Sequence, residues 1–217
     1  MENSVSQHQI RSYIIQAQEE EIKRISLELH EGVGQNLYSI YTGLQLVESG
    51  LGQHHLKNYL HEMTQLIEKT ITEIRLLSVE LHPPALTTLG LVPALKSYLK
   101  LYTSTFGVQV ELETTGVEKQ LPEQSSVAVF RVCQEALTNI AKHADTSDVK
   151  MSLLWNEAEL KISIVDFGGG FAADEIEMNT VSLGIAAMKE RMLLTGGHCL
   201  ISSKIGGGTS VEISLPI

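Results

Sequence analysis

Two long runs of apolar residues at helical spacing constrain the fold of this chain more than any other feature. The first run predicts one long helix from about residue 9 to residue 49. Its apolar stripe, at steps of three and four, comprises Ile22, Ile25, Leu29, Val33, Leu37, Ile40, Leu44 and Val47. Residues 49–53 have the composition of a turn, and a second stripe predicts a helix over residues 54–81. Two such helices with a short connection form an antiparallel hairpin.

A single hairpin leaves part of each stripe uncovered. Pairing with a second copy into a four-helix bundle covers it, so we expect a homodimer. His82-Pro83-Pro84 ends the second helix, because proline disfavours the helical conformation of the residue before it. We therefore expect a helical hairpin for dimerisation over residues 1–82 and a separate domain over residues 83–217.

Strand and helix patterns alternate in the second domain. We expect strands over 108–113, 148–155, 160–165, 198–203 and 209–215, and helices over 91–105, 122–143 and 183–194. This order predicts an α+β sandwich, in which helices cover one face of a mixed sheet.

Charge and composition exclude several classes of function. The 217 residues carry a formal net charge of −10, so we expect no direct binding to nucleic acid. No apolar run long enough for a membrane span occurs, and the N-terminus lacks the features of a secretory signal. The two cysteines, Cys133 and Cys199, belong to no Cys-x-x-Cys pair and suit a reducing compartment, so we expect a cytoplasmic location.

Residues suited to binding a phosphorylated ligand and a metal ion gather in the second domain. In chain order they are Glu135, Asn139, Lys142, His143, Asp166, Gly168, Gly170, Leu183, Gly184, Gly208 and Thr209. Glycines let backbone N–H groups approach phosphate closely. An aspartate at a strand end can accept a hydrogen bond from an amino group such as that of adenine. An asparagine amide oxygen is a hard ligand suited to Mg²⁺.

A candidate nucleophile, His30, lies inside the first predicted helix. A neutral histidine nitrogen can attack a phosphoryl group when a carboxylate orients its other N–H, and the adjacent Glu31 can do so. The amide of Gln35, one turn beyond Glu31, can position a water molecule. Gly32 and Gly34 each cost about 1 kcal/mol against alanine inside a helix, which indicates that another group approaches this stretch closely.

The candidates of the second domain resemble, in order and spacing, the nucleotide site of the GHKL ATPase family. Glu135-x-x-x-Asn139 looks like the N box, Asp166-x-Gly168-x-Gly170 the G1 box, Leu183-Gly184 the G2 box, and Gly208-Thr209 the end of the last glycine box. The resemblance implies ATP as the ligand, with Asn139 binding Mg²⁺, Glu135 ordering the water around the metal and Asp166 reading the adenine amino group. Lys142 and His143 follow the N box and are expected near the phosphates.

Residues 27–37 resemble the phosphoacceptor helix of two-component sensor histidine kinases with a HisKA-3-type dimerisation domain. Residues 81–91 resemble the connector between the two domains of that subclass, whose partners are mostly NarL/LuxR-type response regulators. The resemblance implies autophosphorylation of His30 by ATP, transfer to a response-regulator aspartate, and phosphatase activity involving Gln35. Glu31 replaces the usual Asp, and Phe167 replaces the usual Asn of the G1 box. The segment between Phe171 and Leu183 is short for an ATP lid, as in this subclass.

Alternative functions remain open at this point. The same ATPase fold serves serine kinases of the anti-sigma-factor type, but that interpretation leaves the hairpin and His30 unexplained. An ATP-driven clamp would need a transducer domain that is missing here. A non-catalytic dimeric scaffold has only Phe167 in its support. Since no sensor region is present, the chain is either a catalytic fragment, such as the cytoplasmic part of a membrane-bound sensor, or a naturally soluble member of the family.

Overall fold

The computed structural model describes residues 2–50, 54–81, 83–172 and 180–217. The chain forms two compact units, Met1–Pro84 and Ala85–Ile217. The predicted turn at 51–53 and the predicted helix stop at His82 lie outside the described residues.

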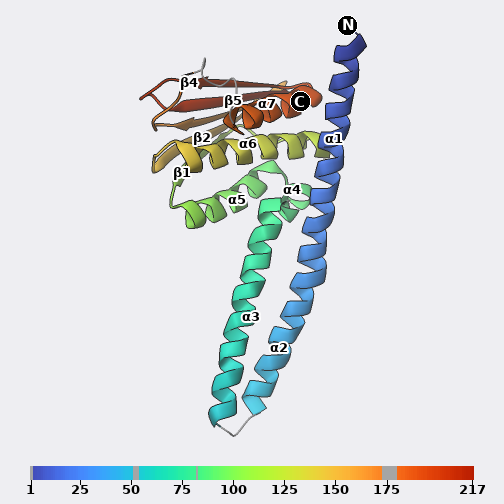
Figure 1. Ribbon diagram of the computed structural model, residues 1–217, viewed down its shortest axis with the longest axis vertical. Coiled ribbons are helices and arrows are strands. Elements are labelled where there is room, and N and C mark those ends of the chain that lie inside the picture. The colour runs from blue at the N-terminus through green and yellow to red at the C-terminus, as the bar shows by residue number, and fades with distance from the viewer. Residues whose placement is uncertain (1, 51–53, 82, 173–179) are drawn as a thin grey trace. The chain divides into compact units, whose positions relative to one another are not determined.

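The first unit is a helical hairpin (Figure 1). Its first arm comprises α1 (Glu2–Leu27), the π-helical segment η1 (Glu28–Val33) and α2 (Gly34–Gly50). Its second arm, α3 (His54–Leu81), has the bounds that the sequence predicts, and all three segments of the first arm pack against it. The backbone stays in the helical region at Leu27 and at Gly34, so the first arm runs through η1 without a break. The prediction of one regular helix was therefore wrong within η1, where the spacing gave no sign of a π-helix.

The predicted apolar stripe of the first arm divides into two rows. Ile22, Leu29, Leu37 and Leu44 are half-buried. Ile25, Val33, Ile40 and Val47 remain 37% to 52% exposed. On α3, Ile71 is buried, but Met63, Leu66 and Leu77 are exposed. One hairpin thus leaves part of its apolar surface exposed.

The second unit is a five-stranded mixed sheet with helices on one face (Figure 1). Its strands are β1 (Gln109–Thr115), β2 (Asp148–Trp155), β3 (Glu159–Asp166), β4 (His198–Ser203) and β5 (Thr209–Pro216), in the order β1-β2-β3-β5-β4. Only β1 and β2 pair in parallel; the other pairs are antiparallel. The helices are α4 (Pro84–Thr88), which the sequence did not predict, α5 (Leu91–Phe106), α6 (Glu123–His143) and α7 (Thr180–Leu194). The predicted α+β sandwich is confirmed.

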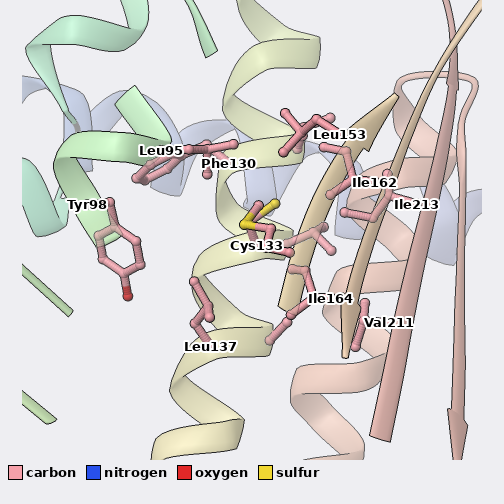
Figure 2. Close-up of a cluster of buried hydrophobic side chains, with 14 of the residues drawn as sticks. Leu95, Tyr98, Phe130, Cys133, Leu137, Leu153, Ile162, Ile164, Val211 and Ile213 are labelled. Atoms are coloured by element: carbon pink, nitrogen blue, oxygen red, sulfur yellow. The ribbon is translucent and has the colours of Figure 1, made fainter. Parts of the chain in front are cut away.

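Helix α6 lies at the centre of the core, between the sheet and α5 (Figure 2). Its Phe130 meets Tyr98 of α5 edge to face, with ring centroids 5.5 Å apart. Cys133 packs toward the apolar side chains of β3 and β5, and this burial raises the pKa of its thiol, whereas Leu137 lies on the side of α6 that faces α5. The half-buried polar positions of α6 are Gln134, Glu135, Thr138 and Asn139.

No helix in the described ranges is both long enough and apolar enough to cross a membrane.

Candidate functional site

Asp166 lies at the end of β3 and is 2% exposed. Its Oδ1 accepts a hydrogen bond from the backbone N–H of Gly168 at 2.9 Å, which fixes the carboxylate relative to the loop that follows. The N–H of Gly169 donates to the carbonyl oxygen of Ala144, at the C-terminal end of α6, at 2.9 Å. A Cβ on Gly168 would stand 1.9 Å from that same carbonyl oxygen. The loop therefore rests on the end of α6, and only glycine permits the contact.

The last glycine-rich turn packs against the Asp166 loop. Gly170 has a φ of 57°, and a Cβ there would stand 2.1 Å from the carbonyl oxygen of Lys204. Gly208 has a φ of 76°, and a Cβ there would stand 2.1 Å from the carbonyl oxygen of Asp166. Both glycines thus combine a left-handed backbone with close backbone contact.

Ser203 is a functional candidate that the sequence analysis missed. Its Oγ accepts a hydrogen bond from the N–H of Phe171 at 2.9 Å and lies 3.0 Å from the carbonyl oxygen of Gly208, to which it donates. It also lies 3.0 Å from Oγ1 of Thr209. One hydroxyl therefore joins the two glycine-rich segments. Its only sequence signal is its place at the end of a strand, just before the last glycine box.

A second cluster forms where α7 approaches α6. Nδ2 of Asn139 donates to Oε1 of Glu135 across 3.4 Å, one helical turn apart. A Cβ on Gly184 of α7 would stand 2.3 Å from the same Oε1. The two oxygen-bearing side chains therefore pack against the bare Cα of Gly184. An amide oxygen and a carboxylate are hard donors, and a set this small suits Mg²⁺, which keeps most of its waters and phosphate ligands.

The remaining predicted residues surround these clusters. Lys142 and His143 are exposed on the last turn of α6. Leu183, at the start of α7, is 71% exposed, and Phe167 is 60% exposed. Most of the predicted lid, residues 173–179, lies outside the described residues. The structure thus brings the residues of the G1-like and last glycine segments together, and separately Glu135 and Asn139 of α6 with Gly184 of α7.

His30 lies in η1, where its side chain and that of Glu31 are exposed. Gln35, at the start of α2, is exposed as well. The other nearby carboxylate, Glu28, forms an ion pair with Arg24 at 3.0 Å. Glu31 is the carboxylate next to His30 in the chain.

The two glycines beside His30 differ in their surroundings. A Cβ on Gly32 would meet nothing within 4 Å. A Cβ on Gly34 would stand 3.3 Å from the carbonyl oxygen of Leu29, which accepts the hydrogen bond from the N–H of Gly34. The close approach expected from these glycines is therefore, at Gly34, an approach by the chain's own backbone.

Two protein families match successive parts of the chain. Residues 21–86 match a family described as histidine kinase, and this range contains His30. Residues 124–217 match the family described as histidine kinase-, DNA gyrase B-, and HSP90-like ATPase, and this range contains both clusters on α6.

Two curated relatives match nearly the whole chain. The signal transduction histidine-protein kinase/phosphatase DegS of Brevibacillus brevis is 34% identical over 94% of this chain and 53% of its own length. The oxygen sensor histidine kinase NreB of Staphylococcus carnosus is 35% identical over 97% of this chain and 60% of its own length. The chain thus spans little more than half of each relative.

A solved structure shares the fold. The histidine kinase domain of a blue-light activated histidine kinase from Erythrobacter litoralis superposes with a TM-score of 0.51, at 15% identity, over 84% of this chain and 94% of that domain.

Proposed function

Because this chain belongs to the histidine kinases, we propose that it transfers the γ-phosphoryl group of ATP to its own His30 and then to an aspartate of a response regulator. One observation carries the proposal. One chain contains both parts of such a site, each inside a segment that matches a family. The exposed His30 lies next to the carboxylate of Glu31 in the first segment, and the oxygen donors of Glu135 and Asn139 pack against Gly184 in the second. We assign residues 1–82 to dimerisation and phosphotransfer, and residues 83–217 to ATP binding.

In this proposal ATP is the substrate of the second unit. Asp166 accepts a hydrogen bond from the adenine amino group, and its bond from Gly168 holds the carboxylate in place for that contact. The residues that frame the phosphates are Gly168, Gly170, Leu183, Gly184, Gly208 and Thr209. Lys142 and His143, exposed at the end of α6, offset the negative charge of the triphosphate.

The Asn139–Glu135 pair fits a magnesium site. Bound Mg²⁺ would neutralise charge that develops on the transferred phosphoryl group. Asn139 supplies the amide oxygen as its ligand, and the carboxylate of Glu135 accepts hydrogen bonds from water around the metal. The contact between Asn139 and Glu135 supports this division of roles.

His30 acts as the nucleophile. One ring nitrogen forms a bond to the γ-phosphorus while the bond to the bridging oxygen breaks, and ADP leaves with the electron pair. Glu31 accepts a hydrogen bond from the N–H of the other ring nitrogen. It either only orients the ring or also acts as the base that takes the proton of that nitrogen. The exposure of His30 supports this role, because ATP must reach the ring.

A homodimer is the state that this chemistry uses. The row of Ile25, Val33, Ile40 and Val47 on the first arm and the exposed Met63, Leu66 and Leu77 on α3 supply the apolar surface for a second copy. A four-helix bundle formed from two hairpins buries both sets.

The partner is a response regulator of the NarL/LuxR type, rather than nucleic acid, which a chain of net charge −10 repels. The name of one relative includes a phosphatase activity. For this chain we assign that activity to Gln35, whose exposed amide can position water against the phosphorylated aspartate.

This relay operates in the cytoplasm, where ATP is available. A serine kinase, a clamp or a scaffold would leave the matched segment around His30 without a role.

The test is incubation of the chain with γ-labelled ATP and Mg²⁺, alongside His30→Gln and Asn139→Ala. We expect acid-labile, alkali-stable label on the parent only. His30→Gln should keep its affinity for ATP, and Asn139→Ala should lose affinity for Mg-ATP by about tenfold or more, since a metal ligand is missing. Label on His30→Gln, or acid-stable label on the parent, would refute the assignment.

A further inference from the structure

His30 lies in a π-helical turn inside the first arm of the hairpin. In η1 the N–H of Gly34 donates to the carbonyl oxygen of Leu29, five residues back instead of the four of an α-helix. Single π-helical turns within α-helices occur frequently at functional sites.

The burial of side chains along the first arm shows where the extra residue goes. The positions that are buried or half-buried include Glu19, Ile22, Ser26 and Leu29 before the turn, and Gly34, Leu37, Tyr41, Leu44 and Glu48 after it. Ser26 marks the face toward α3, because its Oγ donates to the carbonyl oxygen of Ser78 at 3.0 Å. Apart from the half-buried Lys23, which directly follows Ile22, the steps within each set are three and four, but from Leu29 to Gly34 the step is five.

Residues 30–33 fill that longer step, and all four are exposed. A regular α-helix places no more than three residues between successive positions on one face. The π-turn therefore adds one residue to the outward arc and leaves the face toward α3 in phase on both sides. His30 and Glu31 lie at the beginning of this arc.

Gly34 is the residue that suits the turn. Glycine is a poor helix former, yet Gly34 stands at the junction where α2 begins. A Cβ at Gly34 would crowd, at 3.3 Å, the carbonyl oxygen that its N–H binds. An added methyl group therefore requires that oxygen to shift by a few tenths of an ångström, which lengthens the π-type bond and favours the competing α-helical register, which differs by one residue, or about 100° of rotation.

We infer that Gly34 is a positioning residue for phosphoryl transfer: it holds the π-turn, and the π-turn sets the direction in which the His30 ring faces. This inference rests on the proposed autophosphorylation of His30. Gly34 touches no reacting atom and acts through the backbone of residues 29–34.

The test compares Gly34→Ala with Gly43→Ala in the full chain. Both changes improve helix propensity, but a Cβ at Gly43 meets nothing within 4 Å. We expect Gly34→Ala to lower the labelling rate of His30 at saturating ATP by about 100-fold, as displacement of a reacting group by an ångström or more does, with KM for ATP unchanged. Gly43→Ala should label at the parent rate. Both should remain dimeric, and Gly43→Ala should melt no lower than the parent.

Two further variants keep the test decisive if Gly34→Ala fails to fold. Deletion of Gly32 removes the extra residue from the exposed arc, converts the turn to an α-helix and leaves the face toward α3 intact. We expect the same loss of labelling rate. Gly32→Ala leaves the π-turn intact and meets nothing within 4 Å, so the ring direction should not change and the rate should stay within threefold of the parent, about 0.6 kcal/mol.

The outcomes separate the two proposals. A parent that takes no label from ATP overturns the proposed function and this inference with it. A parent labelled on His30, together with equal labelling of Gly34→Ala or of the Gly32 deletion, overturns this inference alone. Loss of labelling in Gly32→Ala but not in Gly34→Ala would also overturn the inference. The glycines would then be required because another group approaches Gly32 closely, and not because of the π-turn.

Discussion

Replacing Gly184 by alanine separates the chemistry of the proposed nucleotide site from the stability of the fold. In the structure Oε1 of Glu135 lies 2.3 Å from the position that the new Cβ would occupy. Contacts of Cβ below 3.0 Å do not occur in real proteins, so this oxygen must move. It belongs to the far end of a flexible side chain, and its contact with Asn139, at 3.4 Å, is already long.

The cost should fall on activity and not on folding. Gly184 lies inside α7, where alanine is preferred to glycine by about 1 kcal/mol. The melting temperature should therefore stay the same or rise. The carboxylate, however, is displaced by roughly an ångström, and a displacement of this size in an active site costs on the order of 100-fold in rate. This corresponds to about 2.7 kcal/mol of transition-state stabilisation.

The assay is the initial rate of His30 labelling at several ATP concentrations, together with thermal unfolding. The path through Glu135 is tested by a double-mutant cycle. If Gly184→Ala acts by displacing Glu135, it should lower the rate of the parent but have no further effect on Glu135→Ala. Parent-like labelling by Gly184→Ala would show that the position of the Glu135 carboxylate does not affect the rate, and additive losses in the double variant would show that Gly184→Ala does not act through Glu135.

Two further predictions concern the stability of the second unit. The carboxylate of Glu118 accepts a hydrogen bond from the N–H of Val92 in the first turn of α5 at 3.0 Å, so Glu118→Ala should lower the free energy of unfolding in urea by about 1 kcal/mol, and an unchanged midpoint would contradict this capping role. Burial, then the neighbouring Tyr98 and Asp166, raises the pKa of Tyr102 from 10.0 to about 12. The folded state therefore holds this proton more tightly than the unfolded state, and the resulting stability is complete below pH 10 and is lost as the pH rises toward 12. The free energy of unfolding of Tyr102→Phe should therefore fall less steeply with pH between 10 and 12 than that of the parent. Equal slopes for parent and variant would contradict the raised pKa of Tyr102.

Most of the fold follows from periodicity in the sequence. In β2 every second residue is buried, and this strict alternation predicted the strand with its correct bounds. The bounds of α3 were equally clear, since a turn sequence precedes the helix and two prolines follow it. Patterns of this kind are readable because each element has one face in the core.

The π-turn was not readable in this way. Ile25, Leu29, Val33 and Leu37 continue steps of four through the segment, so the apolar spacing is satisfied by a regular helix. Only burial in the folded hairpin shows that Gly34, and not Val33, follows Leu29 on the face toward α3. The two glycines signalled an irregularity, but not which atom would approach them.

For the same reason, the glycine boxes say less about ligand contacts than their order in the sequence suggests. The groups that exclude a side chain at Gly168, Gly170 and Gly208 are backbone carbonyl oxygens of Ala144, Lys204 and Asp166, which have no sequence signature. These glycines are required by the packing of one loop on another, whatever the ligand. Gly184 differs, because the atom it accommodates is the Glu135 carboxylate. Loss of ATP binding in a variant of the first three glycines therefore indicates a phosphate contact only when folding is unchanged, whereas at Gly184 a loss of activity in a stable protein points directly to the site.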